Sequence, residues 1–222
     1  MAALGGVLGL DEAGRGSLVG PLVVGGFLAP AMSLPTLGRI GVTDSKLLRP
    51  QRREAIYRRL TEIGTRFVHE IPPAEVDRYV RRGRLNDLEA EYFARIVRRT
   101  RPDFVYLDAC DPVPLRFGET VRRLSGASSI VHAHHHADLR FPVVGAASIV
   151  AKVRRDRAVA TLRRRLGEEL GSGYPSDGRT VAFVRGALQN GAPDPVWLRR
   201  SWATTERLKR ECTARTLDDF RP

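Results

Sequence analysis

Short apolar runs, each bounded by turn-forming residues, predict the strands of this chain. The first two runs, 7–11 and 18–29, are separated by a glycine-rich turn, so we expect them to pair antiparallel. Three more runs of this kind lie at 65–71, 103–110 and 129–136. The pattern therefore predicts five strands.

Apolar residues three or four positions apart predict helices between these strands. Segment 49–63 carries one apolar stripe of this spacing. Segment 85–99 has the same periodicity, with Asn86 or Asp87 as its N-cap. A third and longer helix is predicted over 146–166.

The order of these elements indicates the fold class. Strands that alternate with helices favour an α/β domain whose sheet is largely parallel after the first hairpin. From the segment GSGYPSDGRT onward no strand pattern is visible, and two shorter helices are expected. We therefore divide the chain into a main α/β domain at 1–168, a helical region at 169–209 and a loose polar tail at 210–222.

Composition and charge narrow the class of protein. The 222 residues are 42% hydrophobic and 28% charged, which is ordinary for a soluble globular protein. A net charge of +12 suits a polyanionic partner such as nucleic acid. Charge alone does not distinguish nucleic acid from an acidic membrane surface.

Other features argue against secretion and against a membrane segment. The N-terminal apolar run lacks basic residues and ends at Asp11. The uncharged stretch 16–38 is long enough to span a bilayer, but its three prolines and five glycines favour a strand and a loop. Cys110 and Cys212 are too few and too far apart to indicate a disulfide framework. We therefore expect a cytoplasmic protein that has no contact with membranes.

Four acidic residues share one position relative to the predicted strands. Each follows an apolar run directly or within a few residues: Asp11, Glu12, Asp108 and Asp138. Ligand sites in open α/β sheets form at the carboxyl ends of the strands, so these side chains are expected to converge. Crowded carboxylates repel one another unless a cation compensates them, and oxygen ligands favour Mg²⁺ or Mn²⁺ over zinc. A pair of such ions beside a basic surface would suit a nuclease.

The pair of Asp11 and Glu12 raises a geometric problem. Consecutive side chains of a regular strand point to opposite faces of the sheet. Both carboxylates can therefore serve one site only if the strand ends or bulges at Glu12, which the following AGRG permits. Otherwise Glu12 lies on the surface or contacts the ligands rather than the metal.

Six segments carry a resemblance to a known family. They follow the order and spacing of ribonuclease HII, and they resemble its archaeal branch most, over about residues 7 to 180. The segments are GLDEAGRGSLVGPLVV, TDSKLL, LNDLEAEYFA, YLDACD, HADLRFPVVGAASIVAKVRRDRAV and GSGYPSD. The acidic-glycine signature of the first and the helix AASIVAKVRRD are the most specific.

The resemblance implies both a fold and an activity. The fold is ribonuclease H-like: a mixed five-stranded sheet flanked by helices, with a small C-terminal helical appendage. The activity is that of a monomeric endonuclease that hydrolyses the RNA strand of RNA–DNA hybrids. It also incises on the 5′ side of ribonucleotides embedded in duplex DNA, as in ribonucleotide excision repair and DNA replication. Two Mg²⁺ or Mn²⁺ ions per active site, and product ends with a 3′-hydroxyl and a 5′-phosphate, are implied as well.

The resemblance assigns the residues of the catalytic site by position. The family's four metal-binding, catalytic acids fall on the four acids named above. Its glycine-arginine-glycine loop contacts the 2′-hydroxyl and adjacent phosphate of the ribonucleotide, and it falls on Gly14, Arg15 and Gly16. Glycines on both sides of Arg15 remove side chains that would block so close an approach.

Further substrate contacts follow from the same match. Tyr174 falls on the tyrosine that packs against the sugar at the RNA–DNA junction, and a packed core tyrosine is the alternative. Lys46 matches a lysine that contacts phosphate. Ser148 and Lys152 match positions near the site on the helix after the fourth acid.

The chain departs from the family just before Asp138. The family has a lysine there, whereas this chain has three consecutive histidines, 134–136. His132, His134 and His136 would share one strand face, where three imidazoles can bind zinc. A solvated sheet edge is the alternative.

Two other functions compete with a nuclease. The segment GRGSLVG resembles the dinucleotide-binding pattern G-x-G-x-x-G, but Val19 stands where the third glycine belongs, and a strand rather than a helix follows. A non-catalytic nucleic-acid-binding module explains the positive charge but not the acids at the strand ends.

The last residues, TARTLDDFRP, resemble a short binding peptide of the same family. Archaeal ribonucleases HII often end in a peptide that binds the sliding clamp: a glutamine, an aliphatic residue three positions on, then two aromatics. Here Leu217 and Phe220 match the apolar anchors, whereas Ala214 and Arg221 replace the glutamine and the second aromatic. The resemblance predicts a weakened clamp-binding peptide, and a disordered or folded-back tail is the alternative.

Overall fold

The computed structural model describes residues 6–42, 48–189 and 195–218, with side chains described as far as Thr213. The chain divides into two compact units, which we call the sheet unit and the helical unit. The sheet unit comprises Met1–Ala13, Val23–Glu70 and Leu85–Arg154, and the helical unit comprises Gly14–Leu22, Ile71–Arg84 and Arg155–Pro222. The domain boundaries predicted at residues 168 and 209 stay predictions.

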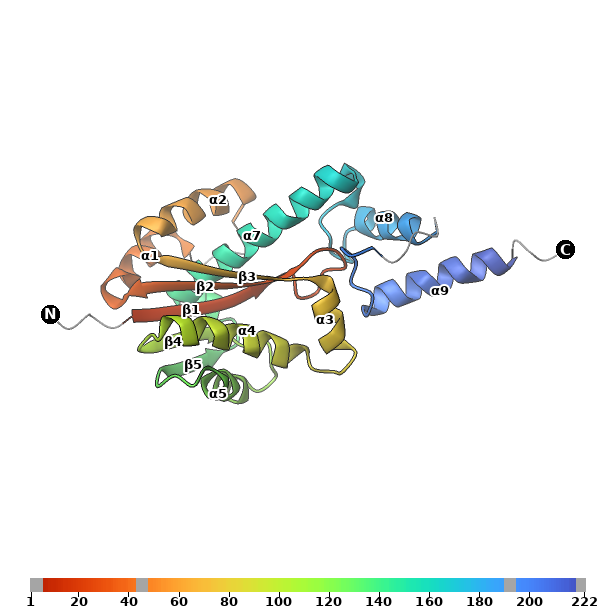
Figure 1. Cartoon of the computed structure of the whole chain (residues 1–222). Coiled ribbons are helices and arrows are strands. Elements are labelled where there is room, and N and C mark those ends of the chain that lie inside the picture. The colour runs from red at the N-terminus through yellow and green to blue at the C-terminus, as the bar shows by residue number, and fades with distance from the viewer. Residues whose placement is uncertain (1–5, 43–47, 190–194, 219–222) are drawn as a thin grey trace. The chain divides into compact units, whose positions relative to one another are not determined.

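The strands and helices follow each other in the order drawn in Figure 1. The strands are β1 (Gly6–Ala13), β2 (Leu22–Pro30), β3 (Thr65–Ile71), β4 (Phe104–Asp108) and β5 (Ile130–His134). The helices are α1 (Leu34–Ile40), α2 (Pro50–Arg59), α3 (Pro73–Val80), α4 (Leu85–Thr100), α5 (Pro114–Ser125), α6 (Ala137–Arg140), α7 (Pro142–Leu166), α8 (Gly178–Gln189) and α9 (Ala203–Asp218).

The strands form one mixed sheet in the order β3-β2-β1-β4-β5. Strands β1 and β2 pair antiparallel, as the glycine-rich turn predicts. Strand β4 then runs parallel to both β1 and β5. This mixed five-stranded sheet flanked by helices confirms the fold expected from the sequence.

Helices cover both faces of the sheet. Helices α1 and α2 lie on the same side as the first half of α7, whereas α4 and α5 cover the other side (Figure 1). The core on the α7 side joins Val7 and Phe27 of the sheet to Val144, Ile149 and Val150 of the helix. Burial of these side chains stabilises the layer by roughly 1.5–3 kcal/mol each.

Two glycines allow α7 to lie unusually close to the sheet. A Cβ at Gly9 would lie 2.1 Å from the carbonyl oxygen of Val143, and one at Gly25 would lie 2.5 Å from that of Ala147. Neither distance is compatible with a side chain, so glycine is required for this contact. The close approach places the first turns of α7 directly against β1 and β2.

The helical unit has its own apolar core. Leu18 and Val19 of the loop between β1 and β2 pack with Val184 of α8 and Leu208 of α9. Val19 also forms an antiparallel bridge with Leu198.

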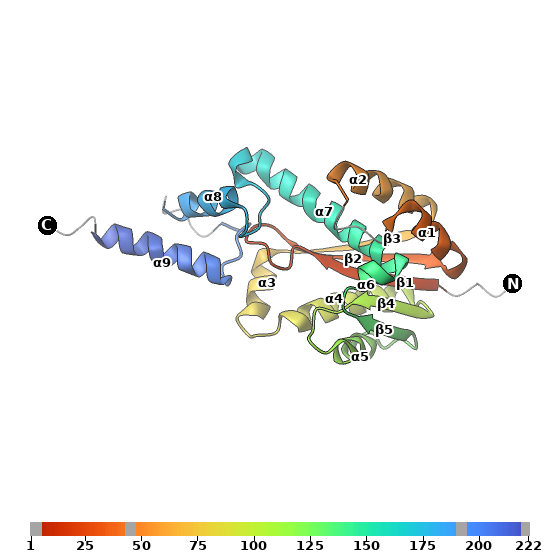
Figure 2. The same cartoon turned by 180° about the vertical axis from the view of Figure 1, so that it is seen from behind.

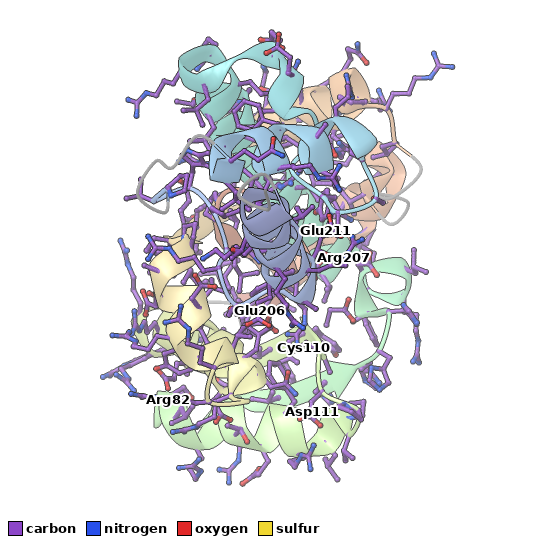
Figure 3. The ribbon with its side chains drawn as sticks, turned by 90° about the vertical axis from the view of Figure 1, so that its right-hand side faces the viewer. Arg82, Cys110, Asp111, Glu206, Arg207 and Glu211 are labelled. Carbon is purple, nitrogen blue, oxygen red and sulfur yellow. The ribbon has the colours of Figure 1, made fainter. Side chains whose placement is uncertain are left out.

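Ion pairs add to the surface of α9. Figure 3 shows Glu206, Arg207 and Glu211 projecting from this helix. Nη1 of Arg207 lies 3.5 Å from Oε1 of Glu211, and Nη2 of Arg185 on α8 lies 3.0 Å from Oε2 of the same carboxylate. Exposed pairs of this kind contribute only ~0.2–1 kcal/mol each.

The sequence pattern missed or misplaced several local features. Helices α1, α3 and α5 were not predicted, and α9 continues to Asp218 although its pattern was expected to stop earlier. Helix α4 begins at Leu85, so Asn86 is not its N-cap; instead Nδ2 of Asn86 donates to Oδ2 of Asp111 at 3.0 Å. Over the described ranges, the structure contains no helix with the length and apolar character needed to cross a membrane.

Candidate active site

Asp11 and Asp108 lie next to each other on neighbouring strands. Strands β1 and β4 pair in parallel up to Leu10 and Leu107, and the two aspartates are the next residue of each strand. Asp11 is opposite Gly25 in the β1–β2 register, so its side chain is on the face covered by α7. The parallel arrangement confirms the expected juxtaposition of these two acids.

Asp138 reaches the same region from α6. This short helix contacts β4, and the view from behind shows it beside that strand (Figure 2). The backbone amide of Ala137 donates to Oδ1 of Asp108 at 3.1 Å, which fixes the start of α6 at the end of β4. Asp138 itself is fully buried. It lies on this helix, four residues after the end of β5.

Ser148 and Lys152 face Asp11 from successive turns of α7. Nζ of Lys152 donates to Oγ of Ser148 at 2.8 Å, and the Ser148 side chain is hydrogen-bonded to Asp11. The four-residue spacing puts both groups on one face of the helix. The structure therefore brings Asp11, Asp108, Asp138, Ser148 and Lys152 together, as the sequence predicted.

The pKa of Asp11 shows that burial and neighbouring carboxylates disfavour ionisation in this cluster of acids. Burial raises the pKa of Asp11, and the nearby carboxylates of Asp108 and Asp138 act in the same direction; Ser148 and Lys152 oppose them, and the net result is a pKa of about 7. A divalent cation would reverse this balance, because it stabilises the ionised form of each aspartate. Carboxylate oxygens are also the ligands that Mg²⁺ and Mn²⁺ prefer. The donor chemistry therefore fits such an ion.

The ligands do not yet form a complete metal cage. Across residues 6–42, 48–189 and 195–218, no three His, Cys, Asp or Glu side chains are arranged to hold an ion as they stand.

The histidines just before Asp138 do not lie on one strand face as expected. His132 and His134 share a face of β5, but His136 lies beyond the strand with a left-handed backbone (φ 54°). The expected three-histidine face is therefore wrong.

Glu12 differs from the three aspartates. Strand β1 pairs regularly with β2 through Glu12–Val24 and Ala13–Val23, so it neither ends nor bulges at Glu12. The Glu12 side chain therefore starts on the opposite face from Asp11. Because β4 ends at Asp108, no residue of β4 lies alongside Glu12 at this end of the sheet.

The glycine-arginine-glycine loop belongs to the helical unit. Gly14 has φ 83°, a conformation that favours glycine, and a Cβ there would lie only 3.0 Å from the carbonyl of Pro21. The Gly14 carbonyl accepts hydrogen bonds from the amide (3.2 Å) and hydroxyl (2.8 Å) of Ser17. Gly16 is exposed, and an added Cβ there meets open space among the described atoms.

Tyr174 lies in the same unit, above an arginine. The guanidinium of Arg155 sits 4.2 Å from the centre of the Tyr174 ring and donates to the carbonyl of Ser172 at 2.7 Å. The carbonyl of Gly173 accepts from the amides of Leu18 (2.8 Å) and Val19 (3.2 Å). Tyr174 is only half-buried, so it is not a core tyrosine.

Some predicted site residues cannot be placed. Lys46 and Phe220 lie outside the described residues, and Leu217 lies in α9 beyond the last described side chain. Conversely, Arg155 was not singled out by sequence, although it is almost fully buried. Arg155 stands directly before Asp156 in a charge-rich stretch of α7. Such a stretch normally indicates solvent-exposed side chains, so no local signal pointed to its burial.

Comparison with known proteins decides the family. The family model described as Ribonuclease HII matches residues 8–205. The chain belongs to the ribonuclease HII family. The ribonuclease HII of Cenarchaeum symbiosum (strain A) is 47% identical over 197 residues, which cover 88% of this chain and 94% of that protein. The resemblance stated from the sequence is thereby confirmed, and with it the class of enzyme: a ribonuclease H that acts on RNA–DNA hybrids.

Solved structures of ribonucleases HII agree with this assignment. The crystal structure of the ribonuclease H2 from Pyrococcus horikoshii OT3 matches with a TM-score of 0.87 at 37% identity, covering 94% of this chain and 99% of that one. The ribonuclease HII in a complex with PCNA from Archaeoglobus fulgidus matches with a TM-score of 0.82 at 35% identity, covering 88% and 94%. The dinucleotide-binding and purely non-catalytic alternatives are therefore excluded.

Proposed function

We propose that this ribonuclease H, besides cleaving RNA–DNA hybrids, incises duplex DNA on the 5′ side of single embedded ribonucleotides. The observation that supports it is the adjacency of Asp11 and Asp108 on β1 and β4, with Asp138 beside them. Carboxylates crowded in this way are stable in ionised form only with a cation. The products carry a 3′-hydroxyl and a 5′-phosphate.

The residues that would hold two Mg²⁺ or Mn²⁺ ions are the three aspartates, joined by Glu12. When bound, such ions activate water and stabilise the leaving oxygen of a phosphodiester. Glu12 would join them from the opposite face of β1, at the level where β4 has already ended with Asp108. Ser148 and Lys152 hold the Asp11 carboxylate in place and favour its ionised form.

Recognition of the ribonucleotide is assigned to the helical unit. A 2′-hydroxyl is the only group that distinguishes RNA from DNA at one sugar, so its reader must make a close hydrogen bond. Within the loop Gly14–Arg15–Gly16, Gly16 is exposed and an added Cβ there would meet open space among the described atoms, so its backbone allows the close approach that this requires. Tyr174, backed by Arg155, offers an apolar ring to the following deoxyribose, where a 2′-hydroxyl would be unfavourable. Lys46 is proposed as a phosphate contact.

The sliding clamp is proposed as a protein partner. A structural relative forms a complex with PCNA, and the last residues of this chain keep two apolar positions of a clamp-binding peptide. Leu217 and Phe220 are the proposed anchors.

The test is cleavage of a labelled DNA duplex that carries one ribonucleotide, with Mg²⁺ or Mn²⁺ and with EDTA. We expect a single metal-dependent cut 5′ to the ribonucleotide, whose 3′ end a DNA polymerase extends without further processing. An all-DNA duplex and a long RNA–DNA hybrid serve as controls. Cleavage of the hybrid without incision at the single ribonucleotide would contradict the finer proposal and leave the family assignment intact.

A further inference from the structure

Arg199 is fully buried, and it is the largest side chain of the described residues in that state. A buried guanidinium is costly unless its donors are satisfied. Two of its three nitrogens donate to the loop between β1 and β2: Nη1 donates to the carbonyl of Arg15 at 2.7 Å, and Nε donates to the carbonyl of Gly20 at 3.2 Å. One planar guanidinium group therefore links the two ends of segment 15–20.

The backbone around Arg199 reinforces the same contact. The Arg199 amide donates to the carbonyl of Leu18 at 2.8 Å, and the Gly20 amide donates to that of Trp197 at 2.9 Å. Behind it, Thr205 of α9 donates to the Arg199 carbonyl at 2.8 Å, and the Arg199 guanidinium lies 4.9 Å from the Trp202 ring centre. The arginine is thus held from α9 while it holds the loop.

Because a peptide bond is planar, the contact between Arg199 and the Arg15 carbonyl also fixes the direction of the neighbouring Gly16 amide. The carbonyl of Arg15 and the amide of Gly16 belong to one planar trans peptide, so they point in opposite directions. Because Arg199 binds that carbonyl inside the protein, the Gly16 N–H is directed away from it, at a residue that is exposed. Ser17 fixes the preceding peptide in the same way through the Gly14 carbonyl.

We infer that Arg199 is a positioning residue for ribonucleotide selection: its guanidinium sets the 15–16 peptide so that the Gly16 amide faces the substrate. This rests on the proposed function, in which the Gly14–Gly16 loop reads the 2′-hydroxyl. Arg199 touches no reacting group. It acts through the peptide that it orients, so its loss affects discrimination between RNA and DNA rather than the chemical step.

The test compares Arg199→Met, which keeps the length and apolar character of the side chain, with Arg200→Met. Arg200 is the matched control, because it is the next arginine and its backbone amide binds Asp77 instead. We measure kcat and KM on a duplex with one ribonucleotide, and the inhibition constant of an all-DNA duplex of the same sequence. Arg199→Met is expected to raise KM about tenfold while kcat and the DNA inhibition constant stay within about twofold.

Arg199→Lys gives a graded version of the same test. A lysine keeps the charge but offers a point ammonium, which cannot hold both carbonyls as the planar guanidinium does. An intermediate rise in KM is therefore expected. A purely structural role would lower the active fraction on every substrate and leave the ratio of KM to the DNA inhibition constant unchanged, and that result would overturn the inference.

A measurement on the wild-type protein covers the case in which the variants fail to fold. In EDTA, which prevents cleavage, the Gly16 amide hydrogen should exchange rapidly in the free protein. The duplex with one ribonucleotide should protect it, and the all-DNA duplex should not. A Gly16 amide already protected in the free protein would refute the proposed orientation. Failure of the wild-type enzyme to cut at a single ribonucleotide would instead refute the proposed function.

Discussion

Asp11 and Asp108 are side by side on a parallel strand pair, each one residue beyond the paired Leu10 and Leu107. Two carboxylates in this position are close because of backbone hydrogen bonding, not because of any attraction between them. The sheet therefore imposes the repulsion that a cation has to relieve. The metal dependence and the pH dependence expected of this enzyme follow from the adjacency of Asp11 and Asp108.

Asp108→Asn is expected to reduce cleavage at least about a hundredfold and to leave folding intact. The amide keeps an oxygen that can accept from the Ala137 amide, so α6 stays in place, but the negative charge is lost. Cleavage rates at saturating Mg²⁺ and thermal melting measure the two effects. Asp103→Asn, at an exposed residue just before β4, is the matched control. Wild-type turnover in Asp108→Asn would remove this residue from the site.

The stability of the metal-free enzyme is expected to fall as pH rises from about 4 to about 7. The folded pKa of Asp11 is about 7, above its ordinary value of 3.8, so between these values the folded protein holds a proton that the unfolded chain has lost. Rising pH then favours unfolding, by at most about 1.4 kcal/mol per pH unit from this group. Above about pH 7 the effect levels off.

Unfolding curves in EDTA at several pH values, for wild type and Asp11→Asn, measure this contribution as the difference between the two proteins. The asparagine variant should gain relative stability as pH rises. Mg²⁺ or Mn²⁺ should stabilise the wild type more at pH 8 than at pH 5, because the ionised aspartates bind the metal. A difference between the two proteins that does not change with pH would show that Asp11 is not protonated in the folded state.

Gly25→Ala is expected to destabilise the protein by ~1–3 kcal/mol and to lower activity as well. The added Cβ would lie 2.5 Å from the Ala147 carbonyl oxygen and 2.8 Å from the Ala151 amide nitrogen, so α7 has to move. That movement would displace Ser148 from Asp11. Gly38→Ala on α1 is the control: its Cβ meets open space among the described atoms, and helix propensity predicts a gain of up to ~1 kcal/mol. Denaturant unfolding compares the two.

Features set by local patterns were predictable from the sequence, whereas features set by packing were not. Strand periodicity and the position of acids after apolar runs correctly placed Asp108 next to Asp11. The face of Glu12 depends on how far β1 pairs with β2, which no local signal reports. Arg199 was missed because arginine is normally a surface residue, and only the folded chain shows its buried guanidinium.

Tyr174→Ala is expected to impair incision at a single ribonucleotide more than cleavage of a long hybrid. A single ribonucleotide offers one defined junction, whereas a hybrid offers many equivalent sites. Tyr174→Phe keeps the ring that Arg155 contacts at 4.2 Å, so it should retain most of the selectivity. The ratio of kcat/KM on the two substrates is the measurement. Equal losses on both would mark Tyr174 as a structural residue.

The C-terminal peptide is expected to bind the sliding clamp of the same organism weakly, with micromolar affinity. Leu217 and Phe220 keep the spacing of one helical turn, and α9 already extends to Asp218, so part of the ordering cost is met before binding. Titration of the full chain, in which α9 is formed, against the clamp tests this, with Phe220→Ala as the loss variant and Asp219→Ala as the matched control. Binding absent at hundreds of micromolar, or unchanged by Phe220→Ala, would rule out the proposed anchors. Removing residues 219–222 should leave nuclease activity without the clamp unchanged, because every acid of the site lies in the sheet unit.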